Sequence, residues 1–470
     1  MTTAFDLLVI GAGPAGGNAA LEAASAGLTV ALIDEGTAAG GQVWRAPRTA
    51  QATRNRTQDP DRTRGDDLRA RLAASSVRVF PATQVWDARP QFHISCVSDD
   101  GAQELHAPRL ILATGAIERV LPFEGWTTPG VFGLAAATAV MKSEKALFGR
   151  DIVIAGQGPL LIAVAAKALD LGLRPRAIID RSHRGDWLRA TAGFARVPSM
   201  LATGARWMSR LALAGIPYHR RSEVIRANGD TTLRSVVIRD LGTGATREIE
   251  ADTLYIGNGL TSADELHRLL GAAQTADLLR GGYRTTRDDR CRSSVPGLYI
   301  AGDGGGVYGA LPSAMQGKIA GLSAACDHGA LCETQFAAQV RGPQRKLRRL
   351  ETFADASCRL MQFPQDATPR MSPQTIVCRC EDVSRADIEK AMDDGARDLN
   401  QLKHFTRLGM GPCQGRMCGL TAAAILSHRH AGSGTDTRLT PRSPVRPVEM
   451  TQLIGEFDYD DIPVPKPAPL

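Results

Sequence analysis

Four of the nine cysteines in this 470-residue chain lie close together near its carboxyl end. One residue separates Cys378 from Cys380, four separate Cys413 from Cys418, and 32 lie between the two pairs. Thiolates are ligands for soft metals and for iron–sulfur clusters. The spacing lacks the paired C-x-x-C pattern that is usual for structural zinc. A 2Fe–2S cluster is therefore the first interpretation, and zinc or unliganded thiols remain as alternatives.

Short helices are expected around these cysteines. Ser384, followed three positions later by Asp387, is a capping pattern that predicts a helix ending near Gly395. Residues 399–409 and 419–428 predict two further helices. The cysteines then fall on loops that these helices can bring together. Nearby helix N-termini and loop N–H groups would favour the negative charge of four thiolates.

The amino-terminal end of the chain carries a nucleotide-binding pattern. A continuous apolar strand leads into the G-x-G-x-x-G fingerprint, and a second strand ends in an acidic residue. Gly11 permits the tight turn, Gly13 lets the backbone approach a pyrophosphate, and Gly16 lets the helix pack closely on the strand. A carboxylate after the second strand can bind a ribose hydroxyl. The residues expected at this first site are Gly11, Gly13, Pro14, Ala15, Gly16, Asp34 and Glu35.

Residues 150–180 repeat the order of strand, glycine turn, helix and strand, with Gly156 and Gly158 in the turn. Leu161 takes the place of the third glycine, so this helix is not expected to approach its strand as closely. Asp180 ends the second strand and would disfavour the 2′-phosphate of NADP. NAD is therefore the ligand expected here, if there is one. The alternative is a unit that keeps the fold and binds no nicotinamide nucleotide.

Three segments resemble flavoproteins with two dinucleotide-binding domains, such as the thioredoxin reductase and glutathione reductase groups. The segments "RLILATGAIE" and "GLYIAGDGGG" are apolar strands that end in glycine-containing turns, and "GGQVW" precedes them in the chain. In those groups the Gly-Asp pair holds the ribityl and pyrophosphate part of FAD, and a loop like "GGQVW" runs over the flavin. The contacts that this resemblance adds for FAD are Gly41, Gln42, Thr114, Gly115, Gly302 and Asp303.

The whole pattern is similar to one family of flavoproteins that carry a bacterioferritin-associated-ferredoxin-type 2Fe–2S module at the carboxyl end. The matching segments are "GGQVWR", "ATGAIERVLPFEGWTTPGV", "GDGGGVYGALPSAMQGKIAG" and "CRCEDV…CQGRMCG". The family includes the A subunit of opine (octopine and nopaline) oxidases, the B subunit of hydrogen cyanide synthase, and subunits of hydroxyproline and proline dehydrogenases. It is related to the alpha subunit of heterotetrameric sarcosine oxidase. The resemblance covers residues 1 to about 430 and implies that the four cysteines bind the cluster.

The resemblance implies an α/β fold of two Rossmann-like units, one inserted in the other, with a small helical 2Fe–2S domain after them. The expected boundaries are residues 1–118 and 260–330 for the FAD-type domain, 119–259 for the inserted NAD-type domain, 331–374 for a helical linker, 375–430 for the 2Fe–2S domain and 431–470 for an extended tail. The tail would either wrap a partner subunit or stay solvated. A long polar loop is expected at residues 45–67.

In this family the amine is oxidised in a smaller FAD-containing subunit, while the larger one, which this chain resembles, supports electron transfer to a respiratory acceptor. The resemblance therefore implies an electron-transfer flavoprotein subunit of a heteromeric dehydrogenase acting on CH–NH donors in opine catabolism. Its expected partners are the smaller subunit plus a further small one. FMN can lie at a subunit interface, and NAD or ATP can replace FAD at the first site. No catalytic residue is expected in this chain.

Other functions remain open at this point. The chain could serve hydrogen cyanide synthase or a hydroxyproline or proline dehydrogenase, or act alone as an NAD(P)H-dependent reductase that feeds a 2Fe–2S centre. A structural scaffold that binds a nucleotide and zinc, without a redox role, is a further alternative.

Composition narrows the function classes further. The chain is 43% hydrophobic and 22% charged, as in ordinary globular proteins. Its net charge is +7, but the basic residues are not interleaved with aromatic residues, so a nucleic-acid partner is not expected. The sequence has no run of about 20 apolar residues and no basic amino-terminal region, so neither a transmembrane segment nor a signal peptide is expected. We expect a cytoplasmic protein with reduced thiols, associated at most with the inner face of the membrane through its complex.

Overall fold

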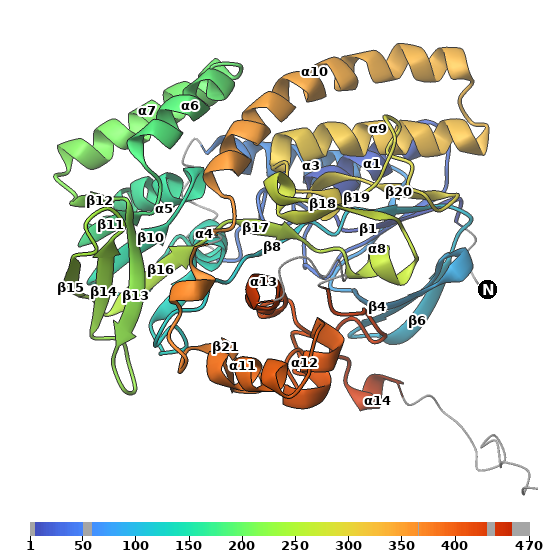
Figure 1. Cartoon of the computed structure of the whole chain (residues 1–470). Helices are drawn as coiled ribbons and strands as arrows, with labels where there is room; N and C mark the ends of the chain where they lie inside the picture. Colours follow the sequence, from blue (N-terminus) through green and yellow to red (C-terminus); the bar gives the residue numbers. More distant parts are fainter. Residues whose placement is uncertain (1–4, 50–58, 365, 430–437, 454–470) are drawn as a thin grey trace, which may run out of the picture.

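The computed structural model describes residues 5–49, 59–364, 366–429 and 438–453. One five-stranded sheet, in the order β20-β7-β1-β2-β3, has every neighbouring pair parallel (Figure 1). The strands of this first sheet are β1 (Leu7–Ile10), β2 (Val30–Ile33), β3 (Arg78–Phe80), β7 (Leu110–Leu112) and β20 (Leu298–Ile300).

A second parallel sheet, in the order β12-β11-β10-β16-β9, lies beside the first. Its strands are β9 (Val131–Gly133), β10 (Ile152–Gly156), β11 (Ala177–Asp180), β12 (Tyr218–Arg220) and β16 (Thr253–Gly257). All of them fall in the chain between β7 and β20 of the first sheet. The second unit is thus inserted in the first, and the exact domain borders remain a prediction.

Smaller antiparallel sheets surround these two. They are formed by β4 (Gln84–Arg89), β5 (His93–Ser98) and β6 (Gly101–His106); β13 (Ser222–Asn228), β14 (Ser235–Asp240) and β15 (Thr246–Glu250); β8 (Ala116–Glu118) and β17 (Leu260–Ser262); β18 (Gln274–Asp277) and β19 (Gly282–Thr285); and β21 (Ile376–Cys378) and β22 (Val383–Ser384).

Helices cover the sheets and form most of the carboxyl-terminal unit. They are α1 (Pro14–Ser25), α3 (Pro60–Ala73), α4 (Leu134–Ser143), α5 (Pro159–Asp170), α6 (Arg184–Phe194), α7 (Pro198–Leu213), α8 (Glu265–Leu269), α9 (Ala310–His328), α10 (Glu333–Leu360), α11 (Arg385–Asp393), α12 (Leu399–Thr406), α13 (Gly419–Arg429) and α14 (Met450–Leu453). Short 3-10 turns are η1 (Pro90–Phe92), η2 (Leu278–Arg280), η3 (Gly302–Gly305) and η4 (Thr368–Arg370). No helix within the described ranges is long and apolar enough to cross a membrane.

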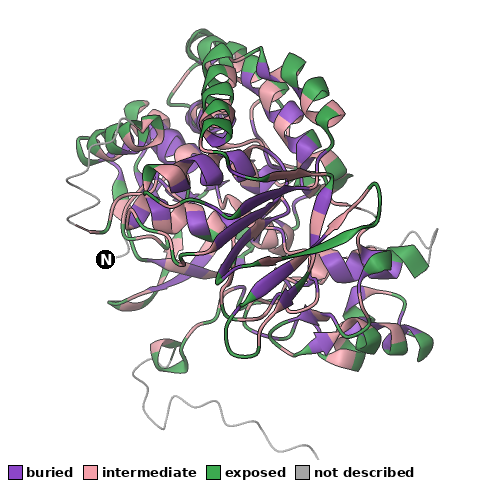
Figure 2. Cartoon of the chain, turned by 90° about the vertical axis from the view of Figure 1, so that its left-hand side faces the viewer, coloured by how far each residue is buried: buried purple, intermediate pink, exposed green. Residues whose placement is uncertain are grey.

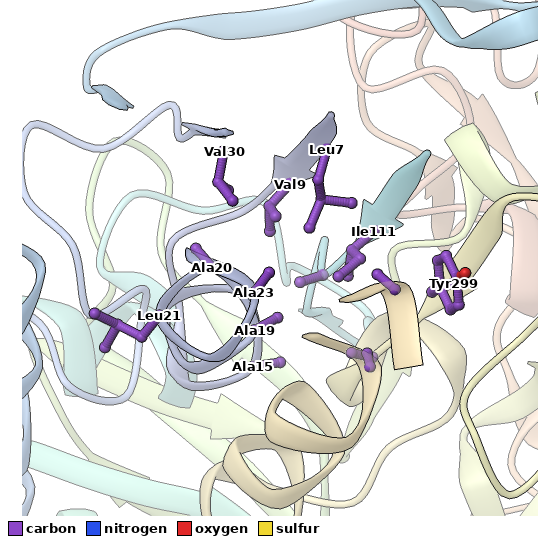
Figure 3. Close-up of a cluster of buried hydrophobic side chains, with 14 of the residues drawn as sticks. Leu7, Val9, Ala15, Ala19, Ala20, Leu21, Ala23, Val30, Ile111 and Tyr299 are labelled. Carbon is purple, nitrogen blue, oxygen red and sulfur yellow. The ribbon is translucent and has the colours of Figure 1, made fainter. Parts of the chain in front are cut away.

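The core of the first unit lies between its sheet and helices α1 and α9. Figure 2 shows central strands of the chain as buried, with exposed residues on the outer helix faces. In Figure 3 the labelled side chains of β1 and β2 face those of α1. Burial of one such Leu or Val side chain stabilises the fold by roughly 1.5–3 kcal/mol. Glycines let α9 approach α1 closely, since a Cβ at Gly317 would lie 2.0 Å from the Ala15 carbonyl oxygen and one at Gly321 2.3 Å from that of Ala19.

Helix α3 corrects one expectation. The predicted loop at residues 45–67 is wrong over residues 60–67, which belong to this helix. The Asp59 carboxylate caps the helix by accepting the Asp61 N–H at 3.0 Å, and Pro60 stands at the first helical position, where no N–H is needed. Lys167 of α5 pairs with Asp59 at 3.1 Å, which fixes the start of the helix against the second unit.

The carboxyl-terminal unit is a small helical bundle with its own core. The predicted capping of α11 is confirmed, since the Asp387 N–H donates to the Ser384 hydroxyl and the Asp387 carboxylate accepts the Ser384 N–H. The Trp126 indole N–H donates to the Ile376 carbonyl at 2.7 Å, and the Thr421 hydroxyl to that of Val120 at 3.1 Å. These bonds attach the bundle to the chain segment that leads into the second unit.

Part of the predicted tail lies against its own chain. Val445 is buried in the cluster beneath the β4-β5-β6 sheet, and its N–H donates to the Trp86 carbonyl at 2.8 Å. Arg268 donates to the Leu439 carbonyl at 2.6 Å. At Val445 and Leu439 the tail is therefore not simply solvated, while its wrapping of a partner subunit stays a prediction. The tail positions 431–437 and 454–470 lie outside the described residues.

Candidate functional site

The first glycine turn joins β1 to α1, and its three glycines differ in the space around them. A Cβ at Gly11, whose φ is +100°, would lie 2.4 Å from the Ala113 carbonyl oxygen, and one at Gly16 would lie 1.7 Å from the Gly11 carbonyl oxygen. Both positions thus need glycine for packing. At Gly13 the nearest atom to a Cβ is the Gly41 Cα at 3.8 Å, so this position has open space before it. That opening is what a pyrophosphate requires.

The predicted "GGQVW" loop reaches this turn. The Gly40 N–H donates to the Ala12 carbonyl at 2.8 Å, and Gly41 adopts a φ of +57° against the Gly13 backbone. Gln42 is exposed and accepts a hydrogen bond from Arg45 at 2.5 Å. Trp44 is buried, and its indole N–H has no partner among the described residues. The loop therefore lies against the first glycine turn, and its contact with a flavin stays a prediction.

The two acidic residues after β2 differ in their exposure and in the contacts that their carboxylates make. The Asp34 carboxylate accepts the N–H of Ala12 and, at 2.7 Å, the N–H of Gly36. It is only partly buried, and that burial raises the pKa of Asp34. An oxygen of this carboxylate can therefore still meet a ribose hydroxyl beside the turn. Glu35 is exposed and lies 3.9 Å from Arg446 of the carboxyl-terminal segment.

The Gly302–Asp303 turn meets the start of α1. A Cβ at Gly302 would lie 2.8 Å from the Ala15 Cβ, which places the two predicted motifs side by side although 286 positions separate them in the chain. The Gly302 N–H donates to Gln316 Oε1 at 2.9 Å. Gln316 Nε2 is buried, and no partner for it exists in the part of the chain that the structure describes.

The Asp303 carboxylate is held by its own loop. It accepts the N–H groups of Tyr308 and Gly309, both at 2.8 Å, and the Ser313 hydroxyl at 3.0 Å. Burial raises the pKa of Asp303, although these donors act in the opposite direction. The carboxylate therefore orients the loop ahead of α9.

Thr114 and Gly115 stand at the end of β7. The Thr114 hydroxyl donates to the Ala263 carbonyl at 2.6 Å and lies 3.2 Å from His267 Nε2. His267 is fully buried, and burial lowers its pKa to about 3, so its ring is neutral. Thr114 thus joins β7 to the segment that returns from the second unit. Sequence reasoning missed His267, because it touches no motif along the chain.

These residues fit a nucleotide that carries a pyrophosphate, such as FAD. The Gly13 position is open, and Asp34 lies next to it. The amide of Gln316 and the indole N–H of Trp44 are buried donors without partners among the residues described, and each such donor costs about 1–3 kcal/mol unless a ligand or water pairs with it. The predicted first-site residues are therefore gathered at one turn.

The second glycine turn is covered by its own chain. A Cβ at Gly156 would lie 1.9 Å from the Gly257 carbonyl oxygen, and one at Gly158 would lie 2.4 Å from Met361 Cγ. The Gln157 amide donates to the Gln362 carbonyl at 2.7 Å. The segment that follows α10 thus occupies the position from which a pyrophosphate would approach this turn.

Asp180 is not available to a ribose. Its side chain has no exposed surface, and its carboxylate accepts the Trp187 indole N–H at 3.0 Å, the Tyr218 hydroxyl at 2.7 Å and the Ser182 N–H at 2.8 Å. Asp34, at the same place in the first unit, keeps a partly exposed carboxylate. The geometry therefore favours the alternative in which the second unit keeps its fold without a nicotinamide nucleotide.

The four predicted ligand cysteines come together as two pairs of free thiols. Cys378 at the end of β21 is hydrogen-bonded to Cys418, which precedes α13, and both are buried. Cys380 is exposed and hydrogen-bonded to the half-exposed Cys413. The hydrogen bond from Cys418, followed by backbone N–H groups, lowers the pKa of Cys378 to about 6, so its thiolate is favoured.

The pairs do not form one closed set of ligands. Within the described ranges, no three His, Cys, Asp or Glu side chains are arranged so that they could hold a single metal ion. In a 2Fe–2S cluster two ligands bind each iron, whereas structural zinc needs four ligands around one point. The 2Fe–2S cluster stays a prediction at this point, with zinc as its alternative. A Cβ at Gly411 would lie 2.1 Å from the Cys380 Cβ, so this glycine lets the two cysteine loops meet.

Comparisons with known proteins cover almost the whole chain. The family described as "Pyridine nucleotide-disulphide oxidoreductase" matches residues 5–329, and "Sarcosine oxidase A3 domain" matches residues 372–456. The A subunit of opine oxidase from Rhizobium meliloti (strain 1021) is 32% identical, over 96% of this chain and 98% of the relative. The HcnB subunit of hydrogen cyanide synthase from Pseudomonas aeruginosa is 31% identical, over 94% of this chain and 96% of the relative.

Among solved structures, L-proline dehydrogenase from P. horikoshii has the same fold. It matches with a TM-score of 0.69 at 24% identity, over 97% of this chain and 80% of that chain. The likeness extends beyond the two nucleotide-type units into the carboxyl-terminal part.

Proposed function

Because this chain belongs to the pyridine nucleotide-disulphide oxidoreductase family, in the group of the opine oxidase A subunits, as its motifs predicted, we propose that it is the FAD-binding electron-transfer subunit of a heteromeric amine-oxidising complex. One observation carries the proposal. A single chain holds an open nucleotide turn at Gly13 and two thiol pairs at the other end of its sequence.

The first site is proposed to hold FAD. The open space at Gly13 would accommodate the pyrophosphate, and the Asp34 carboxylate would bind the ribose. The turn at Gly302 would contact the ribityl part of the flavin. The Gln316 amide and the Trp44 indole N–H would donate hydrogen bonds to the ligand. NAD or ATP in place of FAD remains an alternative within this proposal. The thiolates of Cys378, Cys380, Cys413 and Cys418 are proposed to bind a 2Fe–2S cluster. When bound, FAD exchanges electrons in pairs and the cluster exchanges them singly, so that a pair can be divided.

Amine oxidation is proposed to take place on a partner subunit. The two carboxylates beside the first turn, Asp34 and Asp303, both accept backbone N–H donors, and His267 is buried and neutral. Each of these groups has a structural role, and none is placed as a free base for a substrate. The smaller FAD-containing subunit, a further small subunit, FMN at their interface, an opine substrate and a respiratory acceptor are parts of the same proposal.

A stand-alone NAD(P)H-dependent reductase is less well supported. Such an enzyme needs a nicotinamide site in the second unit. In that unit Met361 lies on the Gly158 turn, and the Asp180 carboxylate already accepts hydrogen bonds from three donors. The two functions differ in the compound that reduces the flavin of the isolated chain.

Anaerobic reduction of the flavin separates the two functions. The chain would be purified alone and together with its proposed smaller FAD-containing subunit, and the flavin absorbance recorded after addition of NADH, octopine or nopaline. The control is the small subunit by itself, which shows the response of its own flavin. We expect no bleaching of the isolated chain by NADH, and bleaching of its flavin by an opine only in the complex. Rapid bleaching of the isolated chain by NADH would contradict the proposal.

A further inference from the structure

A cavity of about 380 Å³ lies between the second unit and the segment that leads into the carboxyl-terminal unit. Gly156 at the end of β10 and Asn258 after β16 line it, so it opens at the carboxyl ends of the parallel strands. That edge is where open α/β sheets bind ligands, and the volume lies in the range of small-molecule pockets. The segment from α10 past β16 to β21 closes its other side (Figure 1).

A dinucleotide does not fit this cavity. Met361 and Gln362 occupy the glycine turn where a pyrophosphate would bind. Asp180, which would bind the adenosine ribose, is fully buried with three donors. The space that remains beside this closed turn accommodates a compact molecule.

Three arginines converge on one carboxylate at the cavity. Arg181, Arg239 and Arg370 approach the Glu223 carboxylate at 3.0, 2.6 and 3.3 Å. Asp366 adds a second carboxylate, 2.6 Å from Arg181 and 2.7 Å from Arg370. Three guanidinium groups against two carboxylates leave one positive charge. A further pair that lines the cavity, Arg226 and Glu124, is separated by 3.1 Å and cancels in charge.

The other walls are largely apolar, with one unused polar group. Phe123, Val224, Ile256 and Met371 are among the lining residues. Thr375 also lines the cavity; it is 2% exposed, and its hydroxyl has no partner among the residues that the structure describes. A buried hydroxyl without a partner is costly, so an oxygen or nitrogen of a ligand at this place would be stabilising.

We infer that this cavity binds a small organic carboxylate with a short aliphatic part. The guanidinium fork matches a carboxylate, and these three arginines already bind one, that of Glu223. The surplus positive charge attracts a second carboxylate, the apolar wall accepts the aliphatic part, and Thr375 meets a polar atom. Because Met371 and Thr375 belong to the segment that enters β21 and Cys378, the ligand also joins the second unit to the carboxyl-terminal unit.

Calorimetric titration of the full chain with its bound flavin tests the site. The probes are glutarate, glutamate and pyruvate, with the neutral glutaramide and inorganic phosphate for comparison. Wild-type protein is expected to bind at least one of the three carboxylates saturably, and to bind glutaramide and phosphate at least tenfold more weakly. Arg370→Met removes the surplus charge and is expected to weaken binding at least tenfold.

Two further variants keep the result interpretable. Arg210→Met removes the same charge from an ion pair with Asp170 that does not line the cavity, and binding should change less than twofold. Val237→Phe fills part of the cavity without a change of charge and should weaken binding as much as Arg370→Met does. Thermal unfolding of Val237→Phe and Arg370→Met shows whether both variants are folded. The inference is overturned if none of the three carboxylates binds, if phosphate binds equally well, or if Arg370→Met and Arg210→Met have equal effects.

Discussion

Replacement of Gly13 by alanine separates nucleotide binding from folding. The backbone of Gly13 has a φ of −71° and a ψ of −170°, which alanine adopts without strain, and its Cβ would meet nothing closer than the Gly41 Cα at 3.8 Å. Loss of glycine from the N-cap of α1 costs up to about 1 kcal/mol. The lower entropy of the unfolded chain returns about 0.4–1 kcal/mol. We therefore expect the nucleotide-free Gly13→Ala protein to unfold within about 0.5 kcal/mol of wild type.

Nucleotide affinity should respond very differently. The new methyl group stands in the opening through which the backbone would approach the pyrophosphate. We expect the affinity for FAD to fall at least tenfold, which corresponds to about 1.4 kcal/mol. Fluorescence titration of the nucleotide-free protein with FAD measures the affinity, and denaturant unfolding of the same samples measures the stability.

Gly11→Ala is the matched contrast. Its φ of +100° and a Cβ 2.4 Å from the Ala113 carbonyl oxygen force the backbone to shift. This variant should lose about 1–3 kcal/mol from the backbone conformation alone, with or without nucleotide. The reasoning is refuted if Gly13→Ala binds FAD as tightly as wild type, or if it loses as much stability as Gly11→Ala.

Two further predictions concern buried carboxylates. Burial raises the pKa of Glu118 to about 7 from 4.5, so the folded chain keeps a proton that the unfolded chain has lost, and stability falls as pH rises from about 4.5 to 7. Glu118→Gln should therefore stabilise the protein by about 2 kcal/mol more at pH 8 than at pH 5 in urea unfolding, and an effect independent of pH would contradict this reasoning. Asp180→Ala leaves the partly buried donors of Trp187 and Tyr218 unpaired and should cost about 2–4 kcal/mol of stability without loss of bound flavin. An unchanged free energy of unfolding in that variant would contradict the structural role of Asp180.

Features that depend on neighbours in the chain could be predicted from the sequence. The turn glycines of the first unit follow from the strand before them and the helix after them. The helix after Ser384 follows from a cap and its partner three residues later. The start of α3 could also have been predicted from local sequence, because Asp59 and Pro60 are residues typical of a helix N-terminus. The arginine-rich composition of this segment instead led to the prediction of a loop.

Features that depend on distant contacts could not be predicted. Asp180 looked like a ribose ligand, and only the fold brings Trp187 and Tyr218 onto its carboxylate. Met361 lies on Gly158 across about 200 residues of chain, and no local pattern marks that contact. Val445 entered the core of the first unit from a segment whose prolines indicated an extended tail. In each case tertiary packing decided whether a motif residue is open to a ligand.

Iron and acid-labile sulfide per chain, measured on anaerobically purified protein, test the central claim most directly. The account predicts about two of each per chain in wild type, in protein that also carries the nucleotide. Cys378→Ser should lose most of the iron, whereas Cys332→Ser, an exposed cysteine outside the carboxyl-terminal unit, should keep it. Zinc in place of iron, or equal iron in the two variants, would contradict the account.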